Sequence, residues 1–187
     1  MPIPSAPGSG QRIRQDSLGS PALGTTTAVH AAVTDTAVQV VVTTGITSPV
    51  VPRNITATSG GTAADIKAIQ VIVAGTNVEG VAITETLPVF TENSATTVVG
   101  SKAFATVTSI TIPAHDGTGA TTAIGTGAKL GLPQRQTRDG VVAAHLNGVR
   151  EATRPTVVVS ASAVESNTIQ LSSALDGSAV VVDWYAS

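Results

Sequence analysis

Three histidines are the residues best suited to acid–base chemistry or metal binding in this chain of 187 residues. His30, His115 and His145 lie far apart, and each falls in a different expected element. Asp116 follows His115, so these two residues are a candidate metal pair or catalytic dyad. The segment 113–119 around them instead has the composition of an exposed turn, because Asp-Gly pairs favour turns. No second ligand pair stands at a recognisable spacing, so we expect no catalytic residue and no metal ligand.

Motifs for phosphate binding and nucleophilic catalysis are incomplete. The Gly-Thr-Gly tripeptides at 117–119 and 125–127 lack the rest of Gly-x-Gly-x-x-Gly, and neither opens a helix that could bind phosphate. The chain has no Gly-x-Ser-x-Gly elbow and no cysteine, which excludes thiolate zinc sites and cysteine nucleophiles. A Ser–His–Asp triad without that elbow stays open, but we expect no cofactor and rank an enzyme last.

Four oxygen-bearing residues, Asp65, Asn77, Glu79 and Glu85, surround the clearest hairpin signal of the chain. Calcium takes six to eight oxygen ligands, so such a cluster is a possible calcium site. Turn chemistry and a solvated sheet edge explain the same residues more simply. We therefore expect no calcium here.

Basic residues are the best candidates for contact with a partner. The residues that we expect to make such contacts are Arg12, Arg14, Arg135, Arg138, Arg150 and Arg154. The first two could anchor an N-terminal arm on a neighbouring molecule, and the other four could face an acidic surface. A solvated loop is the alternative for the second group. Nucleic acid is not an expected partner, because the formal net charge is −2 and no aromatic residues interleave with the basic ones.

The elements that must position these residues are strands. The chain is 42% hydrophobic but only 2% aromatic, and it is rich in Val and Thr, which favour pleated surfaces. With 18 Gly and 10 Pro to make turns, this composition predicts an all-β fold, an antiparallel sandwich or barrel. Charged residues make up only 12%, which predicts a chain that buries part of its surface in an assembly. A soluble but adhesive β domain is the alternative.

Changes in amino-acid composition and strand pattern along the chain divide it into three regions. Residues 1–24 are rich in Pro, Gly and Ser and are expected to form an extended arm. Residues 25–133 are expected to form the sandwich, and residues 134–187 a smaller C-terminal β module. Strands are expected at 27–33, 38–43, 54–58, 66–74, 81–87, 97–104, 107–112, 120–128, 141–149, 156–160, 168–172 and 179–185, with a short helix at 161–166.

The turn at 75–80 gives the clearest hairpin signal. In its second arm we expect Val81, Ile83 and Leu87 to share the buried face, with Glu85 breaking that row.

The N-terminus has no basic region followed by an apolar run, and no stretch approaches the roughly 18 apolar residues of a spanning helix. We therefore expect no signal peptide and no membrane, and synthesis in a cytoplasm.

Two stretches of the chain resemble modules of tailed-bacteriophage capsid decoration (cement) proteins and related virion structural proteins. One runs from Asn54 through the 75–87 hairpin to Pro133, and the other from Ser166 to Tyr185. The resemblance implies a β-sandwich, no catalysis, and attachment to the major capsid protein on the capsid exterior, as a homotrimer made in a host bacterium.

Two other functions compete with capsid decoration. A tail, baseplate or head–tail connector protein would have the same pattern of β-sandwich strands, and the copy number per virion would distinguish it from a decoration protein. A module that binds host glycans is less favoured, because sugar sites use aromatic platforms and only Trp184 and Tyr185 offer one.

Overall fold

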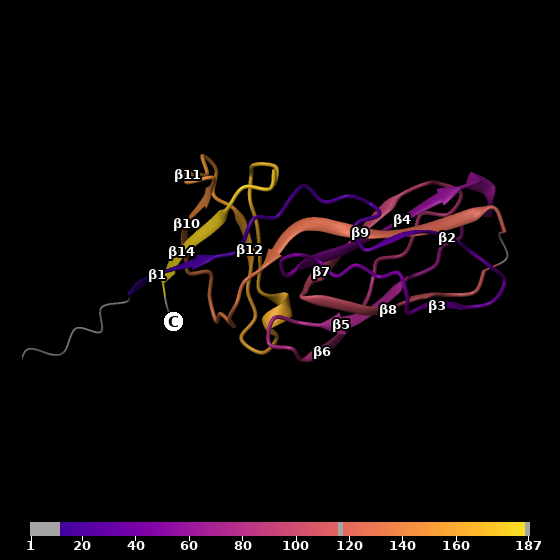
Figure 1. Ribbon diagram of the computed structural model, residues 1–187, viewed down its shortest axis with the longest axis horizontal. Helices are drawn as coiled ribbons and strands as arrows, with labels where there is room; N and C mark the ends of the chain where they lie inside the picture. Colours follow the sequence, from indigo (N-terminus) through magenta and orange to yellow (C-terminus); the bar gives the residue numbers. More distant parts are fainter. Residues whose placement is uncertain (1–11, 116–117, 186–187) are drawn as a thin grey trace, which may run out of the picture.

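The computed structural model describes residues 12–115 and 118–185. All its strand pairings are antiparallel, and its only helical segments in this part of the chain are two 3-10 turns, η1 (Ala63–Asp65) and η2 (Val164–Ser166). The predicted all-β antiparallel fold is therefore confirmed. The molecule is elongated, with a two-layer sandwich at one end and a smaller sheet at the other (Figure 1).

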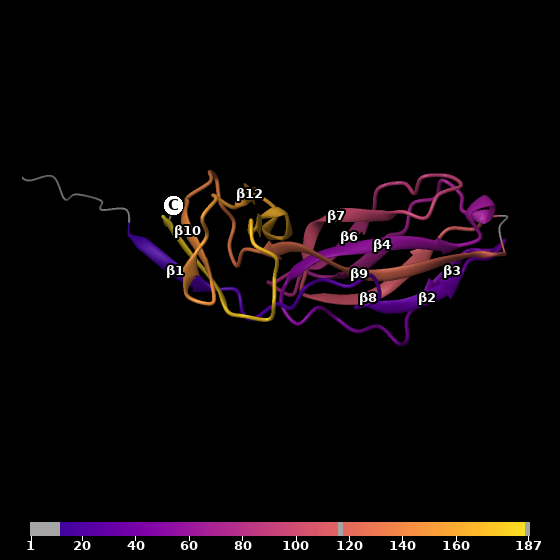
Figure 2. The ribbon, with the colours of Figure 1, turned by 90° about the horizontal axis from the view of Figure 1, so that it is seen from above.

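Two sheets form the layers of the sandwich, which Figure 2 shows from above. The larger sheet contains, in order, β12 (Thr156–Val158), β13 (Thr168–Gln170), β9 (Ala120–Gly131), β4 (Arg53–Gly61) and β7 (Thr97–Phe104), and β2 (His30–Thr34) also pairs with β9. The other sheet contains β3 (Val40–Val42), β8 (Thr106–Ile112), β5 (Ile72–Thr76) and β6 (Ala82–Thr86). Their inner faces enclose an aliphatic core with two phenylalanines, whose fully buried members include Ile55, Val73, Phe104, Ile110 and Ile124.

The third sheet, called the C-terminal sheet below, lies at the other end of the molecule (Figure 1). It contains β1 (Ile13–Ser17), β14 (Val180–Tyr185), β10 (Val141–Leu146) and β11 (Val149–Arg150). A second core packs beneath it around Trp184, and its other members include Leu18, Leu130, Val182 and Ile169. β12 and β13 extend the larger sandwich sheet through β9, and Leu130 of β9 and Ile169 of β13 pack in the second core, so the larger sandwich sheet reaches the C-terminal sheet through side-chain packing.

The segment expected to be an arm is partly built into the fold. Residues 13–17 are extended, but they pair with β14 of the same chain, from Ile13 opposite Tyr185 to Ser17 opposite Val181. Leu18 then contributes to the second core. Residues 1–11 lie outside the described residues. Residues 12–24 therefore differ from a free arm, because they bury apolar surface on their own C-terminal sheet.

The predicted hairpin is confirmed, since β5 and β6 pair from Ile72 opposite Thr86 to Thr76 opposite Ala82. The predicted face of its second arm is partly wrong. Val81 is 55% exposed, whereas Glu85 is only 8% exposed and stands in the buried row.

The burial of Glu85 has a physical reason in the neighbouring strand. The pairing of β4 with β7 shifts register between Asn54 and Thr56, so residues 100–102 bulge out of the ladder. Glu85 Oε1 accepts hydrogen bonds from Ser101 N at 2.7 Å and Ser101 Oγ at 2.8 Å, and Lys102 N lies 3.3 Å from both carboxylate oxygens. The carboxylate thus satisfies backbone donors that the bulge leaves unpaired.

The helix expected at 161–166 is reduced to the single turn η2, whose Val164 is buried.

Candidate partner interface

The structure separates the six arginines expected to meet a partner into three places. Arg12 and Arg14 lie at the start of β1, and Arg135 lies between the two ends of the molecule. Arg138, Arg150 and Arg154 are exposed, and the last two line the same hollow. They therefore do not form one surface, and partner contact by each stays a prediction.

Arg14 mainly contacts its own chain. Its guanidinium lies 5.7 Å from the centre of the Trp184 ring, close enough for a cation–π contact, and its Nε donates to Asp16 Oδ1 at 3.0 Å. The other oxygen of Asp16 accepts from Trp184 Nε1 at 2.7 Å and from Gln134 Nε2 at 2.8 Å. Trp184 is 4% exposed, so it cannot serve as an aromatic platform for a sugar. These residues anchor the terminal strand.

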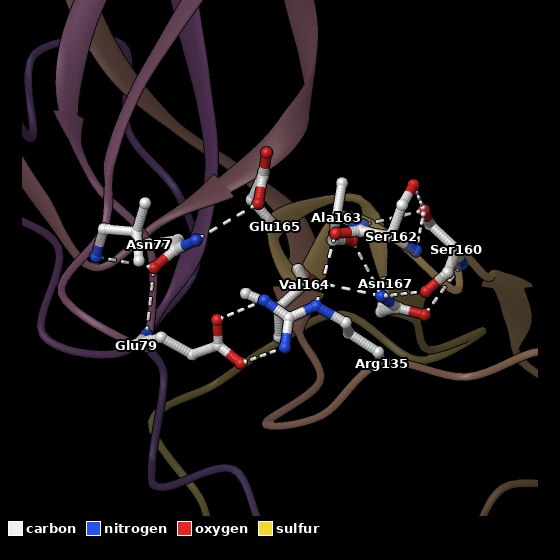
Figure 3. A network of polar contacts seen from close by, with 10 residues as sticks. Asn77, Glu79, Arg135, Ser160, Ser162, Ala163, Val164, Glu165 and Asn167 are labelled. Atoms are coloured by element: carbon white, nitrogen blue, oxygen red, sulfur yellow. Dashed lines mark hydrogen bonds and ion pairs between the residues drawn. The ribbon is translucent and has the colours of Figure 1, made fainter.

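Arg135 belongs to a polar network that joins the sandwich to the C-terminal part (Figure 3). Its Nη1 and Nη2 reach the two carboxylate oxygens of Glu79 at 2.7 and 2.5 Å, and its Nε donates to Ser162 O. Asn77 holds the hairpin turn by accepting from Glu79 N and Val81 N, and it donates to Glu165 Oε2 at 3.2 Å.

A second part of this network centres on Asn167, which is fully buried. Its side-chain nitrogen donates to Ser160 O and Ala163 O, and its side-chain oxygen accepts from Ser160 N (Figure 3). The same oxygen also accepts from Gln136 N. We call the set Asn77, Glu79, Arg135, Glu165 and Asn167 the joint. Its hydrogen bonds fix the loop from 160 to 167 against the hairpin tip.

A hollow of about 440 Å³ opens beside β10 and β11, and its lining includes Val142, Arg150, Glu151, Arg154 and Pro155. Arg154 pairs with Asp139 at 2.6 Å. Arg150 has no ion-pair partner among the residues that the structure describes. Arg150 therefore contributes to this hollow a guanidinium without an ion-pair partner in the described chain.

Glu151 in this hollow is already engaged. Its Oε2 accepts from Ser172 N at 2.8 Å, Ser172 Oγ at 2.5 Å and Ser173 N at 2.8 Å. Burial raises the pKa of Glu151, but the hydrogen bonds from these two serines outweigh it and set the pKa below its ordinary value. The carboxylate holds the 172–173 turn against the end of β11.

The three histidines lie apart. His30 Nδ1 contacts Ala31 O at 2.7 Å, and His145 Nδ1 lies 3.8 Å from Asp183 Oδ2. His115 Nε2 lies 3.5 Å from Asp35 Oδ2, with both side chains buried. Among residues 12–115 and 118–185, no three side chains of His, Asp or Glu gather closely enough to hold a metal ion.

The cluster around His115 has the residue types of a catalytic triad but not its order. Thr122 Oγ1 donates to Asp35 Oδ2 at 3.0 Å, so the hydroxyl is bound to the carboxylate and not to the imidazole. A nucleophile is activated by a hydrogen bond to its base. Burial raises the pKa of Asp35, against the opposing effects of Thr122 and His115. The cluster fastens the 34–36 and 113–115 segments to β9.

Three of the four residues named as calcium candidates have other roles. Glu79 pairs with Arg135, Asn77 caps its own turn, and Glu85 binds the β7 bulge.

None of the helical segments in the described part of the chain has the length and apolarity to cross a bilayer.

Comparison with known proteins identifies no relative: no protein-family model matches the chain, and neither a curated protein nor a solved structure does so.

The most unusual side chain, Arg53, is one that the sequence did not mark. It is charged, it begins a strand, and it is 5% exposed. Its position directly after Pro52, at the start of a strand with no other charged residue, is the one signal that the sequence offers.

Proposed function

We propose that the protein is a non-enzymatic structural component of a tailed-bacteriophage virion, which binds the major capsid protein on the outside of the shell and stabilises it. The resemblance of segments 54–133 and 166–185 to decoration proteins supports this role. The all-β architecture agrees with it.

The surface of the protein carries the proposal. Thirteen large apolar side chains are exposed in the described chain, while only 12% of all residues are charged. They are spread over both ends, with Val38 at 69% and Val50 at 95% exposure in the sandwich region, and Val149 at 70% in the C-terminal sheet. Isolated exposed apolar residues are ordinary. So many on a weakly charged rod favour a protein that is covered by neighbours in an assembly.

The joint suits a clamp between subunits. The Arg135–Glu79 and Asn77–Glu165 contacts connect the two ends of the molecule, and β13 connects them through backbone pairing with β9. A rod whose two ends are fixed relative to each other can contact two neighbouring subunits without losing internal freedom between those ends on binding. Binding only to the assembled shell then stabilises that shell by mass action. Self-association as a trimer on the shell belongs to the same proposal.

The role can be tested by adding purified protein to phage heads that lack it. At a free concentration about 100 times the dissociation constant, ligand linkage predicts about 2.7 kcal/mol of stabilisation for each bound copy. The heads should therefore bind the protein and disassemble at a higher temperature. Heads that bind none of it, with tails that do, would place the protein among the tail or connector components instead.

A further inference from the structure

We propose that Arg53 forms the floor of a binding site for a carboxylate group carried on a short aliphatic stem. The inference goes beyond the structural role proposed above and stands without it.

Arg53 is a buried cation without a counter-charge. Arg53 is the first residue of β4 in the larger sandwich sheet, and it is 5% exposed. No Asp or Glu of the described chain lies within ion-pair distance of it. Burial lowers the pKa of this guanidinium from its ordinary value, but an arginine stays charged at any physiological pH. An isolated buried charge is costly unless an anion compensates it.

Backbone carbonyls use only part of the guanidinium. Nε donates to Gly127 O at 2.7 Å, Nη2 donates to the same oxygen, and Nη1 donates to Ala22 O at 2.9 Å. A guanidinium has five N–H donors. Two N–H groups, one on each terminal nitrogen, thus remain without an acceptor in the described chain. A carboxylate matches such a pair of donors in a bidentate geometry.

A pocket of about 210 Å³ lies over this group, where the 18–24 segment crosses from the C-terminal sheet to the sandwich. Its polar lining residues are Ser20, Thr47, Ser48, Arg53 and Thr126. The rest of its lining is apolar and includes Pro21, Leu23, Pro49 and Val50.

The size and lining of the pocket select the ligand. An engineered cavity of about 150 Å³ holds a benzene molecule, so 210 Å³ has room for one side chain or chain end but not for a larger cofactor. Arg53 is the one charged residue among the described residues that line the pocket, and a single cation suits a monoanion better than a phosphate dianion. A carboxylate with a few methylene groups would place its charge on Arg53 and its stem against Leu23 and Pro49.

The full-length protein can be titrated by NMR with acetate, propionate and butyrate, against sodium chloride at equal ionic strength. We expect saturable shifts at residues 20–23, 47–51, 53 and 126. Affinity should rise about fourfold for each added methylene that becomes buried. Two further ligands distinguish the source of the carboxylate. N-acetyl-L-alanine mimics a chain end, and the α-methylamide of N-acetyl-L-glutamate mimics a glutamate side chain. The ligand that binds more tightly identifies the source.

A matched pair of variants keeps the test independent of folding. Val50 is 95% exposed, so Val50→Glu and Val50→Gln should leave the fold intact. Val50→Glu brings a competing carboxylate to the mouth and should weaken butyrate binding about fivefold or more, the effect of two like charges in contact in water. Val50→Gln has the same length without the charge, so it is the reference against which butyrate binding by Val50→Glu is measured. Equal responses to chloride and butyrate, or equal butyrate affinity in both variants, would overturn the site.

Discussion

In the sandwich, β4 and β9 are nine and twelve residues long and pair along most of their length, whereas β1 and β14 of the C-terminal sheet have five and six residues. The buried sandwich core consists of aliphatic side chains and two phenylalanines, none of which has a polar atom to satisfy. The C-terminal core surrounds one tryptophan whose N–H depends on Asp16, a residue 168 positions away. Long strands with an aliphatic core can fold around their own contacts, but short strands need polar connections and a neighbouring sheet. The comparison therefore predicts that the C-terminal sheet depends on the sandwich for its stability.

The largest effect should come from Phe104→Ala. Phe104 is fully buried in the sandwich core, and such a truncation costs about 3–5 kcal/mol. Because β13 pairs with β9 and Leu130 belongs to the second core, we expect both ends to unfold in one transition. Denaturant unfolding with hydrogen exchange at β14 measures this. A C-terminal sheet that stays protected after the sandwich has unfolded would break the comparison.

Asp16→Ala should have the next largest effect and should act locally. The change leaves the buried N–H of Trp184 without its acceptor, which costs about 1–3 kcal/mol. Hydrogen exchange should accelerate in β1, β10 and β14 but not in β4 or β9. Asp16→Asn is the matched control, since it keeps an acceptor oxygen and should lose less. Equal acceleration in β4 would show that the two ends are a single cooperative unit at this level.

Arg135→Ala tests the joint. The pair with Glu79 is partly exposed, so its net contribution should be at most about 1 kcal/mol despite the bidentate geometry. A double-mutant cycle with Glu79→Ala isolates that contribution. A coupling near zero would mean that the backbone pairing of β9 and β13 holds the two ends together without the ion pair.

The smallest effect should be a dependence of stability on pH at Asp35. Its pKa is raised in the folded protein, so the folded state binds this proton more tightly than the unfolded state. Its contribution to stability is therefore greatest below its ordinary pKa of 3.8, and it is lost as the pH rises through the raised value. Asp35→Asn should remove this fall in stability. Unfolding free energies of both proteins measured from pH 3 to pH 7 provide the test, and a parallel dependence in both would contradict it.

Much of the fold follows from local signals. The hairpin at 75–80 is predictable because two apolar arms flank a turn that begins and ends with glycine, and the pairing of β5 with β6 agrees with it. The strand at 97–104 coincides with β7. Such patterns depend on neighbours in sequence, which is why they are legible without a structure.

The remaining features depend on contacts between distant residues. The pairing of β1 with β14 could not be expected, because a Pro- and Gly-rich segment carries no period that indicates its partner. The burial of Glu85 could not be expected either, because the donors in the β7 bulge that its carboxylate accepts from are invisible in the sequence. Arg53 passed unmarked for the same reason: its three carbonyl contacts come from residues 22 and 127.

Counting the copies of this chain in purified virions by quantitative mass spectrometry tests the central proposal most directly. A decoration protein should be present in a simple ratio to the major capsid protein and should fractionate with heads. A few copies per particle that fractionate with tails, or no copies at all, would contradict the proposal.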